Sequence, residues 1–306
     1  MNEIKIFCPA TIANLNCGFD ILGTCLEGIG DEMIIKKVPQ KGIKITKIKG
    51  ASLPFEPEKN VAGVAALALL DTVNIDFGFE IEIHKKIKAG SGIGSSSASA
   101  AGAVFGINEL LNNIYTKQQL VHFAMKGEAL ASGSEHADNV APCILGGFTL
   151  IRGYNPVDII KIESPADLYA VVLHPHIEIK TADARAVLQP LTTLKNTIIQ
   201  TGNLGGLIAG LYTNDYNLIS RSLQDVIIEP MRKHLIPNFD QTKNCALQNG
   251  ALGAGISGAG PSIFALCKGQ EATDKVALAI RLEYNITKIP FDIHVSKINA
   301  NGICRI

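Results

Sequence analysis

The centre of the chain contains a glycine- and serine-rich segment whose residue types could bind an anion. Residues Lys88–Gly102 read KAGSGIGSSSASAAG, so three glycines alternate with small residues and three serines, Ser95, Ser96 and Ser97, follow at once. Glycine permits positive φ and close backbone approach, and a helix beginning at the serines would direct unpaired N–H groups and its positive dipole end into the loop. The segment therefore predicts a phosphate site, where a serine hydroxyl could also ligate Mg²⁺.

The neighbours of this segment favour a nucleotide. The alternative is an ordinary glycine-rich turn with serine N-caps. A lysine-containing strand is predicted before the segment and a helix after it, which is the order found in P-loops, although the motif G-x-x-x-x-G-K-[ST] is absent. We therefore expect a nucleotide site that differs from that of a Walker-type ATPase.

A second glycine cluster lies late in the chain. Residues Gly250–Pro261, GALGAGISGAGP, contain a literal G-x-G-x-x-G. A dinucleotide fingerprint requires the order strand, loop, helix, whereas here a predicted helix precedes the cluster and a predicted strand, SIFALC, follows it. We interpret this loop as a wall packed against the phosphate site, and a mobile surface turn is the alternative.

A polar loop follows the second of two central helices. Residues Ser132–Pro142, SGSEHADNVAP, crowd His136, Asp138 and Asn139 together with little apolar content. Polar clusters in loops more often carry function than core packing does. Glu128 ends the apolar-periodic helix just before this loop, where it is either a functional group or an ordinary solvated carboxylate.

A turn near the N-terminus and two later arginines could bind a small zwitterion. The segment ANLNCGFDILG places Asn14 and Asp20 around a tight turn, where they could bind an ammonium group or merely cap the turn. Arg185 and Arg232 each offer paired donors for a carboxylate, although a lone arginine is also common on surfaces. His136-x-Asp138 and His174-x-His176 could be metal pairs, but neither has a convincing third ligand nearby in sequence, so we expect no transition metal.

The predicted strands and helices that position these segments indicate an α+β protein with two lobes. The lobes are residues 1–164 and 165–306, with the boundary near Ser164–Pro165. Alternation in GFEIEIHKKI predicts a half-buried strand. The predicted strands are Glu3–Cys8, Glu32–Lys37, Gly78–Ile87, Gly147–Arg152, Leu168–His174, Ser262–Cys267 and Phe291–Lys297. The predicted helices are Lys59–Leu70, Ser95–Leu111, Lys117–Leu130 and Glu271–Tyr284, with a loop over Ala131–Pro142 and helical material over Ala182–Asn249.

Composition narrows the class of protein. The chain has 28 basic residues (Lys and Arg) and 28 acidic residues (Asp and Glu), and it contains no basic run. Nothing in its charge therefore favours a nucleic-acid or anionic-membrane partner. No stretch offers about 18 to 20 uninterrupted apolar residues, and the N-terminus does not resemble a signal peptide, so we expect a cytoplasmic protein. The seven cysteines form no C-x-x-C pair, which favours reduced, buried thiols.

Five segments together resemble one kinase superfamily. They are PATIANLNCGFDILG, GSGIGSSSASA, HADNVAP, KTADAR and ISGAGPSIFAL. In this order, and over essentially the whole chain, they are similar to the galactokinase, homoserine kinase, mevalonate kinase and phosphomevalonate kinase superfamily, the GHMP kinases. The two glycine loops mark the superfamily, whereas NLNCGFD, HADNVAP and KTADAR point to its homoserine branch.

The resemblance implies a fold and an activity. The fold has an N-terminal α+β lobe with a left-handed βαβ crossover and a C-terminal ferredoxin-like lobe. The activity is transfer of a phosphoryl group from ATP to the hydroxyl of L-homoserine in threonine biosynthesis, with Mg²⁺ as cofactor. The family also suggests a homodimer.

The resemblance also assigns residues to the site. Mg²⁺ would be held by Ser96 and Glu128. ATP would be bound by Asn60, Lys85, Lys88, Ala89, Gly90, Ser91, Gly92, Ile93, Gly94, Ser95, Ser96, Ser97 and Ala98. L-Homoserine would be bound by Asn14, Asp20, His136 and Asn139 at its amino and hydroxyl end, and by Thr181, Arg185 and Arg232 at its carboxylate. Residues expected to act in catalysis are Asn139, Ser96, Glu128, Asn14 and Arg185.

Two departures from the family pattern and one missing group stand out. Lys88 stands where the family loop usually begins with proline, and Asn16, Cys17 and Gly18 replace the usual Gly-Pro-Gly. Several relatives use an aspartate base, but the matching residue here is Asn139, whose amide cannot accept a proton at neutral pH. We therefore expect direct transfer without a base, with Asp138 as the alternative base.

Two other functions fit the same sequence. One is a superfamily kinase for mevalonate or a sugar, although Asp20 with Arg185 and Arg232 favours an amino acid. The other is a catalytically silent ligand sensor on the same fold, against which the presence of Ser96 and Glu128 argues.

Overall fold

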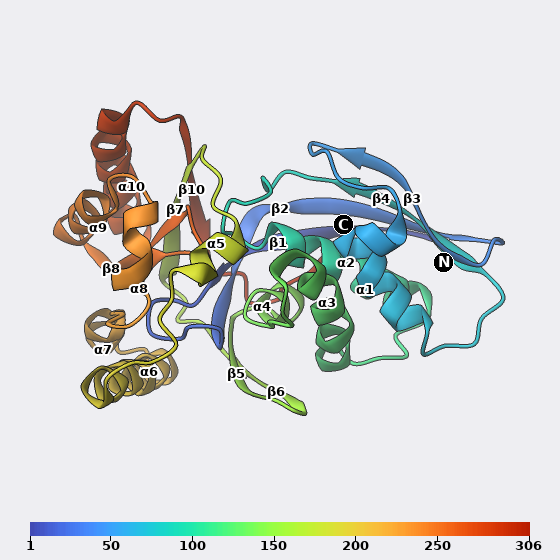
Figure 1. Ribbon diagram of the computed structural model, residues 1–306, viewed down its shortest axis with the longest axis horizontal. Helices are drawn as coiled ribbons and strands as arrows, with labels where there is room; N and C mark the ends of the chain where they lie inside the picture. Colours follow the sequence, from blue (N-terminus) through green and yellow to red (C-terminus); the bar gives the residue numbers. More distant parts are fainter.

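The larger of two β-sheets builds the N-terminal lobe of the computed structural model, which describes all 306 residues (Figure 1). Its seven strands are β1 (Glu3–Ala13), β2 (Leu22–Val38), β3 (Gly42–Lys49), β4 (Gly78–His84), β5 (Phe148–Tyr154), β6 (Val157–Ile162) and β11 (Cys304–Arg305). The order is β11-β1-β2-β4-β3, and β5 pairs with both β2 and β6. Strands β3 and β4 are parallel, whereas the other pairs are antiparallel.

The helices of this lobe gather on one face of the sheet (Figure 1). They are η1 (Pro57–Lys59), α1 (Val61–Leu70), α2 (Ser95–Leu110), α3 (Lys117–Ser132) and α4 (Val140–Leu145). Helix α2 is almost entirely buried because its small residues allow close approach to the sheet: a Cβ at Gly102 would lie 2.6 Å from the Cys8 sulfur, and one at Gly106 would lie 2.6 Å from Ile35 Cδ1. The central helix is thus held tightly behind the predicted phosphate loop.

The C-terminal lobe is built on a four-stranded antiparallel sheet. Its strands are β7 (Leu168–Pro175), β8 (Ala251–Ile256), β9 (Ile263–Lys268) and β10 (Phe291–Lys297). Its helices are α5 (Thr181–Ala186), α6 (Leu194–Thr213), α7 (Tyr216–Ser222), α8 (Glu229–Arg232), η2 (Lys233–Leu235), α9 (Phe239–Gln248), α10 (Gln270–Tyr284) and η3 (Asn285–Thr287). The order β10-β7-β9-β8 is 4-1-3-2 when the strands are numbered within the lobe, which is the ferredoxin-like arrangement.

The structure confirms the α+β class and corrects several element boundaries. Strand β2, expected only over Glu32–Lys37, begins at Leu22, because residues 22–26 are buried on both faces and show no alternation. Strands β3, β6, β8 and β11 were not expected. The region Ala182–Asn249 divides into five α-helices, and the loop expected to extend to Pro142 ends earlier, where α4 begins.

The end of the chain returns to the first lobe. Strand β11 pairs with β1, with Ile6 opposite Arg305 and Phe7 opposite Cys304. The last residues, expected to belong to the lobe 165–306, therefore complete the N-terminal sheet. All seven cysteines are free; five of them are buried as expected, whereas Cys245 is partly exposed and Cys304 is exposed. None of the helices combines the length and apolar character that crossing a bilayer requires.

Candidate active site

A cleft of about 480 Å³ brings together residues of both lobes. It is lined by most of the residues singled out in the sequence. These are Asn14, Asp20, Lys85, Ala89, Gly90, Ser91, Gly92, Gly94, Ser95, Ser96, Ser97, Glu128, His136, Asn139, Thr181, Arg185 and Arg232. Segments more than two hundred residues apart in the chain, such as those of Asn14 and Arg232, thus contribute to one site.

Four residues expected at the nucleotide do not line this cleft. The side chain of Asn60 caps α1 by accepting a hydrogen bond from its first turn. Ile93 is buried in the core, as is Ala98 on the inner face of α2. Lys88 is absent from the cleft lining and contacts His176 and Asp292 of the C-terminal lobe. These four residues therefore lie outside the lining of the cleft.

The central glycine loop has the backbone conformation that its composition predicts. Gly90, Gly92 and Gly94 have φ values of 70°, 81° and 73°, in the left-handed region that favours glycine. A Cβ at Gly94 would lie 2.1 Å from the hydroxyl oxygen of Thr11. Helix α2 begins at Ser95, so the first N–H groups of a 16-residue helix face the loop. This is a ready-made anion site.

The late glycine loop packs against the central one, as expected. The Ser257 hydroxyl donates to the Gly92 carbonyl at 2.7 Å, and the Ser262 N–H donates to the Ser91 carbonyl at 3.3 Å. A Cβ at Gly92 would lie 2.6 Å from the Gly260 carbonyl oxygen. The C-terminal lobe therefore packs against the predicted phosphate loop and forms one wall of the cleft.

A buried ion pair contacts the start of α2, directly after the central glycine loop. The Lys85 ammonium pairs with Asp31, and both side chains are 2% exposed. Lys85 also donates to the Ser95 carbonyl at 2.7 Å and to the Ser99 hydroxyl at 3.0 Å, which ties the strand end to the first turn of α2. Lys85 lines the cleft, but its donors are already engaged. Its role here is to hold the loop in place.

Ser96 and Glu128, the two residues expected to hold Mg²⁺, are in direct contact. The Ser96 hydroxyl donates to one Glu128 carboxylate oxygen at 3.0 Å, and the Ser97 hydroxyl donates to the other at 2.8 Å. Desolvation by burial raises the pKa of Glu128, although both serine hydrogen bonds oppose this shift. A carboxylate and a hydroxyl therefore meet beside the positive end of α2, and both are hard oxygen ligands.

On the opposite side of the cleft, Asp20 and Arg185 form a bidentate ion pair. Arg185 Nη1 and Nη2 donate to the Asp20 carboxylate at 3.0 to 3.1 Å. Arg185 Nη2 also donates to His136 Nε2 at 3.0 Å. Burial lowers the pKa of His136, and the Arg185 charge contributes to this shift, so the imidazole is neutral at pH 7 and can accept this hydrogen bond. The Arg185 guanidinium, which was expected to bind a substrate carboxylate, is therefore largely occupied by Asp20.

Arg232 lies beside this pair and is buried. Its Nε donates to the Ala184 carbonyl at 2.8 Å, and Nη1 donates to the Gly258 carbonyl at 3.3 Å. The Phe19 ring lies 4.9 Å from the Arg232 guanidinium carbon and 5.5 Å from that of Arg185. Burial lowers the pKa of Arg232 to about 10, so the guanidinium stays cationic at neutral pH. Two positive charges therefore face this end of the cleft.

Asn139 and Asp138 are neighbouring residues of the cleft lining. The Thr11 hydroxyl donates to Asn139 Oδ1 at 2.7 Å, so Nδ2 is the group that remains to donate to a ligand. Asp138 also lines the cleft and is 6% exposed. Burial raises the pKa of Asp138 to about 7, and the charges of Asp20 and Glu128 act in the same direction.

The N-terminal turn holds Asn14 and Asp20 in a strained conformation. Asn14, Leu15 and Asn16 have positive φ in succession, as does Asp20. Asn14 Nδ2 donates to the Gly258 carbonyl at 2.8 Å, and its Oδ1 accepts from the Asp20 N–H at 3.0 Å. Asn16, where the family usually has glycine, donates to the Leu223 carbonyl at 2.7 Å. This asparagine therefore anchors the turn to the C-terminal lobe.

Sequence reasoning missed several residues that position this site. The Tyr154 hydroxyl donates to the Asp20 carbonyl at 2.6 Å and accepts from the Ala137 N–H at 3.4 Å. It therefore joins the N-terminal turn to the loop that precedes α4. Thr11 and Phe19 both lie in the segment PATIANLNCGFDILG, so that motif could have pointed to them, although no role was predicted for either. Asp31 lies in a strand that shows no functional pattern. Contacts between distant segments place Asp31 and Tyr154 at the site.

The chain is similar to known proteins over nearly its whole length. The GHMP kinases N terminal domain matches residues 60–147, and the GHMP kinases C terminal domain matches residues 207–286. A homoserine kinase of Chlorobium phaeobacteroides strain BS1 is 43% identical over 316 aligned residues, which cover 99% of both chains. One of Xanthomonas campestris pv. campestris is 37% identical, covering 98% of this chain and 93% of the relative.

Solved structures show the same relationship. The crystal structure of homoserine kinase from Cytophaga hutchinsonii has a TM-score of 0.96 and 48% identity, covering all of this chain and 98% of the other. A structure of L. major mevalonate kinase in complex with R-mevalonate has a TM-score of 0.72 and 17% identity, with 96% of each chain covered. At that identity, the second comparison concerns the fold alone.

Proposed function

Since the chain belongs to the homoserine kinases, a branch of the GHMP kinases, we propose that its cleft transfers the γ-phosphoryl group of ATP to the hydroxyl of L-homoserine. The product is O-phospho-L-homoserine, an intermediate of threonine biosynthesis. One observation of the site carries this proposal: Ser96 and Glu128 meet at the N-terminus of α2, directly beside the glycine loop. An anion site, a pair of hard oxygen ligands and a polar substrate pocket share one cleft.

The Ser96 and Glu128 pair fits Mg²⁺. Mg²⁺ prefers oxygen ligands, and it usually binds through one or two carboxylates together with substrate phosphates. Glu128 and Ser96 would hold it next to the phosphates bound by the Gly90–Ser97 backbone. When bound, the ion neutralises negative charge on the phosphates.

The other side of the cleft suits a zwitterionic amino acid. Asp20 and Asp138 offer negative charge for an ammonium group, and Arg185 and Arg232 offer positive charge for a carboxylate. Arg185 Nε is buried without a hydrogen-bond partner, and the other two nitrogens of the guanidinium bind Asp20 and His136, so Arg185 contributes its charge rather than a free pair of donors to this side of the cleft. We therefore place the amino and hydroxyl end near Asn14, Asp20, His136 and Asn139, and the carboxylate near Thr181 and the arginines.

The chemical step is an in-line displacement. The homoserine hydroxyl oxygen forms a bond to the γ-phosphorus, the bond from that phosphorus to the β,γ-bridging oxygen breaks, and ADP leaves. The hydroxyl proton passes late to the transferred phosphate or to water. A general base supplies about 10² to 10⁴ in rate, or roughly 3 to 5 kcal/mol, whereas positioning two reactants can supply about 7 to 11 kcal/mol. Asn139 fits such positioning because its free Nδ2 can donate to the substrate oxygen.

Asp138 is the alternative base, since a pKa of about 7 suits proton transfer near neutral pH. Under the base-free mechanism, Asp138→Asn retains measurable turnover at saturating substrate, and Asn139→Ala loses more of it. Steady-state kinetics across pH, with homoserine binding measured separately, distinguish the two mechanisms. If Asp138→Asn alone abolishes turnover while binding survives, the base-free mechanism is wrong.

Substrate choice tests the functional proposal directly. ADP release, measured in a coupled assay with L-homoserine, mevalonate and galactose in turn, is expected only with L-homoserine, because Asp20 and the two arginines complement a zwitterion. Release with mevalonate or galactose instead would assign another kinase activity. No release with any of the three at saturating concentration would favour a ligand sensor.

A further inference from the structure

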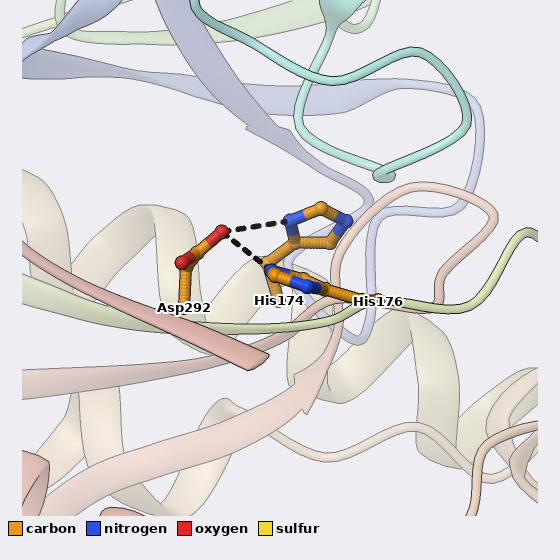
Figure 2. Close-up of side chains that lie close together, drawn as sticks. All are labelled: His174, His176 and Asp292. Carbon is orange, nitrogen blue, oxygen red and sulfur yellow. Dashed lines mark hydrogen bonds and ion pairs between the residues drawn. The ribbon is translucent and has the colours of Figure 1, made fainter. Parts of the chain in front are cut away.

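A cluster of two histidines and an aspartate lies at the edge of the C-terminal sheet (Figure 2), and none of the three residues lines the cleft. His174 lies near the end of β7, and Asp292 is its direct partner on the edge strand β10. His176 follows two residues after His174, and side chains two apart along an extended chain point to the same side. Figure 2 shows all three side chains converging from these two segments.

The distances within the cluster suit a common metal ion. Asp292 Oδ2 lies 2.8 Å from His176 Nε2 and 3.9 Å from His174 Nδ1, and one donor atom from each residue lies within 4.8 Å of the others. Imidazole nitrogens and carboxylate oxygens bind Zn²⁺ at about 2.0 to 2.2 Å, which separates neighbouring ligands of a tetrahedral site by roughly 3.4 Å. Small side-chain rotations therefore suffice to close the cluster around an ion.

The fold supplies the third ligand that is absent from the local sequence. His174 and His176 alone form only a pair, and Asp292 comes 116 residues after His176. Two imidazoles and one carboxylate favour transition metals, whereas Mg²⁺ prefers oxygen ligands alone. The site would thus differ in chemistry from the Ser96 and Glu128 pair in the cleft.

A side chain of the phosphate loop competes for the same position. Lys88 Nζ lies 2.8 Å from His176 Nε2 and 3.3 Å from Asp292 Oδ2, and this side chain is 53% exposed. A flexible ammonium on the surface can move aside when a divalent cation takes its place. We propose that His174, His176 and Asp292 bind a transition-metal ion of the Zn²⁺ class, in competition with the Lys88 ammonium.

Occupation of this site bears on the nucleotide side of the cleft. Lys88 immediately precedes the Ala89–Gly90 start of the phosphate loop, and Glu178, two residues after His176, packs against Gly90. A bound ion releases the contact of Lys88 with the C-terminal lobe. The metal site therefore lies where the loop and the segment after β7 meet.

The protein can be titrated with Co²⁺ in the presence of excess Mg²⁺, which occupies oxygen-ligand sites. The visible absorption of protein-bound Co²⁺ reports its ligands without an activity assay. Zn²⁺ is then expected to displace the bound Co²⁺. His176→Ala and Asp292→Asn are each expected to weaken Co²⁺ binding at least about tenfold, the loss that even outer-shell changes produce. Lys88→Gln is expected to tighten it, since the competing charge is gone. His122→Ala, on an exposed face of α3, is the matched control and binds as the unaltered chain does.

The Glu128→Gln variant separates this site from the cleft, because it lacks the carboxylate of the predicted Mg²⁺ site and should bind Co²⁺ normally. The proposal fails if the unaltered chain shows no saturable Co²⁺ absorption, or if His176→Ala binds Co²⁺ equally well. It also fails if Lys88→Gln weakens Co²⁺ binding, because a competing ammonium cannot assist the metal. The three side chains would then serve only to bind Lys88.

Discussion

Replacing Glu128 by glutamine is expected to lower kcat by about 10²- to 10³-fold, the loss typical when one preorganised electrostatic group is removed. Glu128 is the carboxylate that accepts from both Ser96 and Ser97 at the start of α2. Glutamine keeps the size and one acceptor oxygen but removes the charge that a divalent ion needs. Steady-state kinetics with MgATP and L-homoserine, repeated over a range of Mg²⁺ concentrations, measure the effect, and a higher Mg²⁺ requirement should accompany it.

The fold of this variant should survive, since desolvation already disfavours the charged form of Glu128 and raises its pKa. Thermal unfolding followed by circular dichroism tests this point. Glu135→Gln is a suitable control, because Glu135 pairs with Lys126 at the surface and does not line the cleft. A Glu128→Gln enzyme with the kcat and Mg²⁺ dependence of the unaltered chain would remove Glu128 from the metal site.

Replacing Asp31 by alanine is expected to destabilise the fold by about 3 to 5 kcal/mol, because it leaves the Lys85 ammonium buried without its counter-charge. Both side chains are 2% exposed. Asp31 Oδ1 also accepts from the N–H groups of Lys86 and Ile87 at 2.7 and 2.9 Å, so the change also frees the strand end that leads into the phosphate loop. Urea unfolding at neutral pH measures the loss of stability.

Two further variants make this result specific. Glu32→Gln, at the next position, removes only surface ion pairs with Lys5 and Lys86 and should cost less than about 1 kcal/mol. Asp31→Ala combined with Lys85→Met removes both buried charges and should recover part of the loss. Equal stabilities for Asp31→Ala and Glu32→Gln would show that the buried pair does not support the loop.

Local sequence was sufficient where backbone conformation depends on neighbouring residues alone. The alternating glycines of the central loop predicted positive φ because glycine adopts it without strain, and the serines after them predicted where α2 begins, although its N-cap is Gly94 and no side chain caps it. The alternation of GFEIEIH likewise predicted β4. The short motifs and their order were enough to indicate the kinase family and most residues of the cleft.

Strands whose partners lie far away in the sequence were the main errors. Strand β8, ALGAGI, contains two glycines and has little intrinsic preference for extended structure, so its assignment depends on pairing with β9. Strand β11 has only two residues and exists because the chain end returns to β1. Such pairings are tertiary contacts, and no local pattern records them.

The sequence by itself determined which residue types were present for chemistry and where the phosphate loop lies along the chain. Only the tertiary structure decided how their charges are shared: Arg185 is paired with Asp20, Lys85 with Asp31, and His174 and His176 with Asp292. The physical reason is that an ionic or hydrogen-bonded contact depends on distances of a few ångströms between side chains. Those distances are set by the packing of strands and helices from opposite ends of the chain.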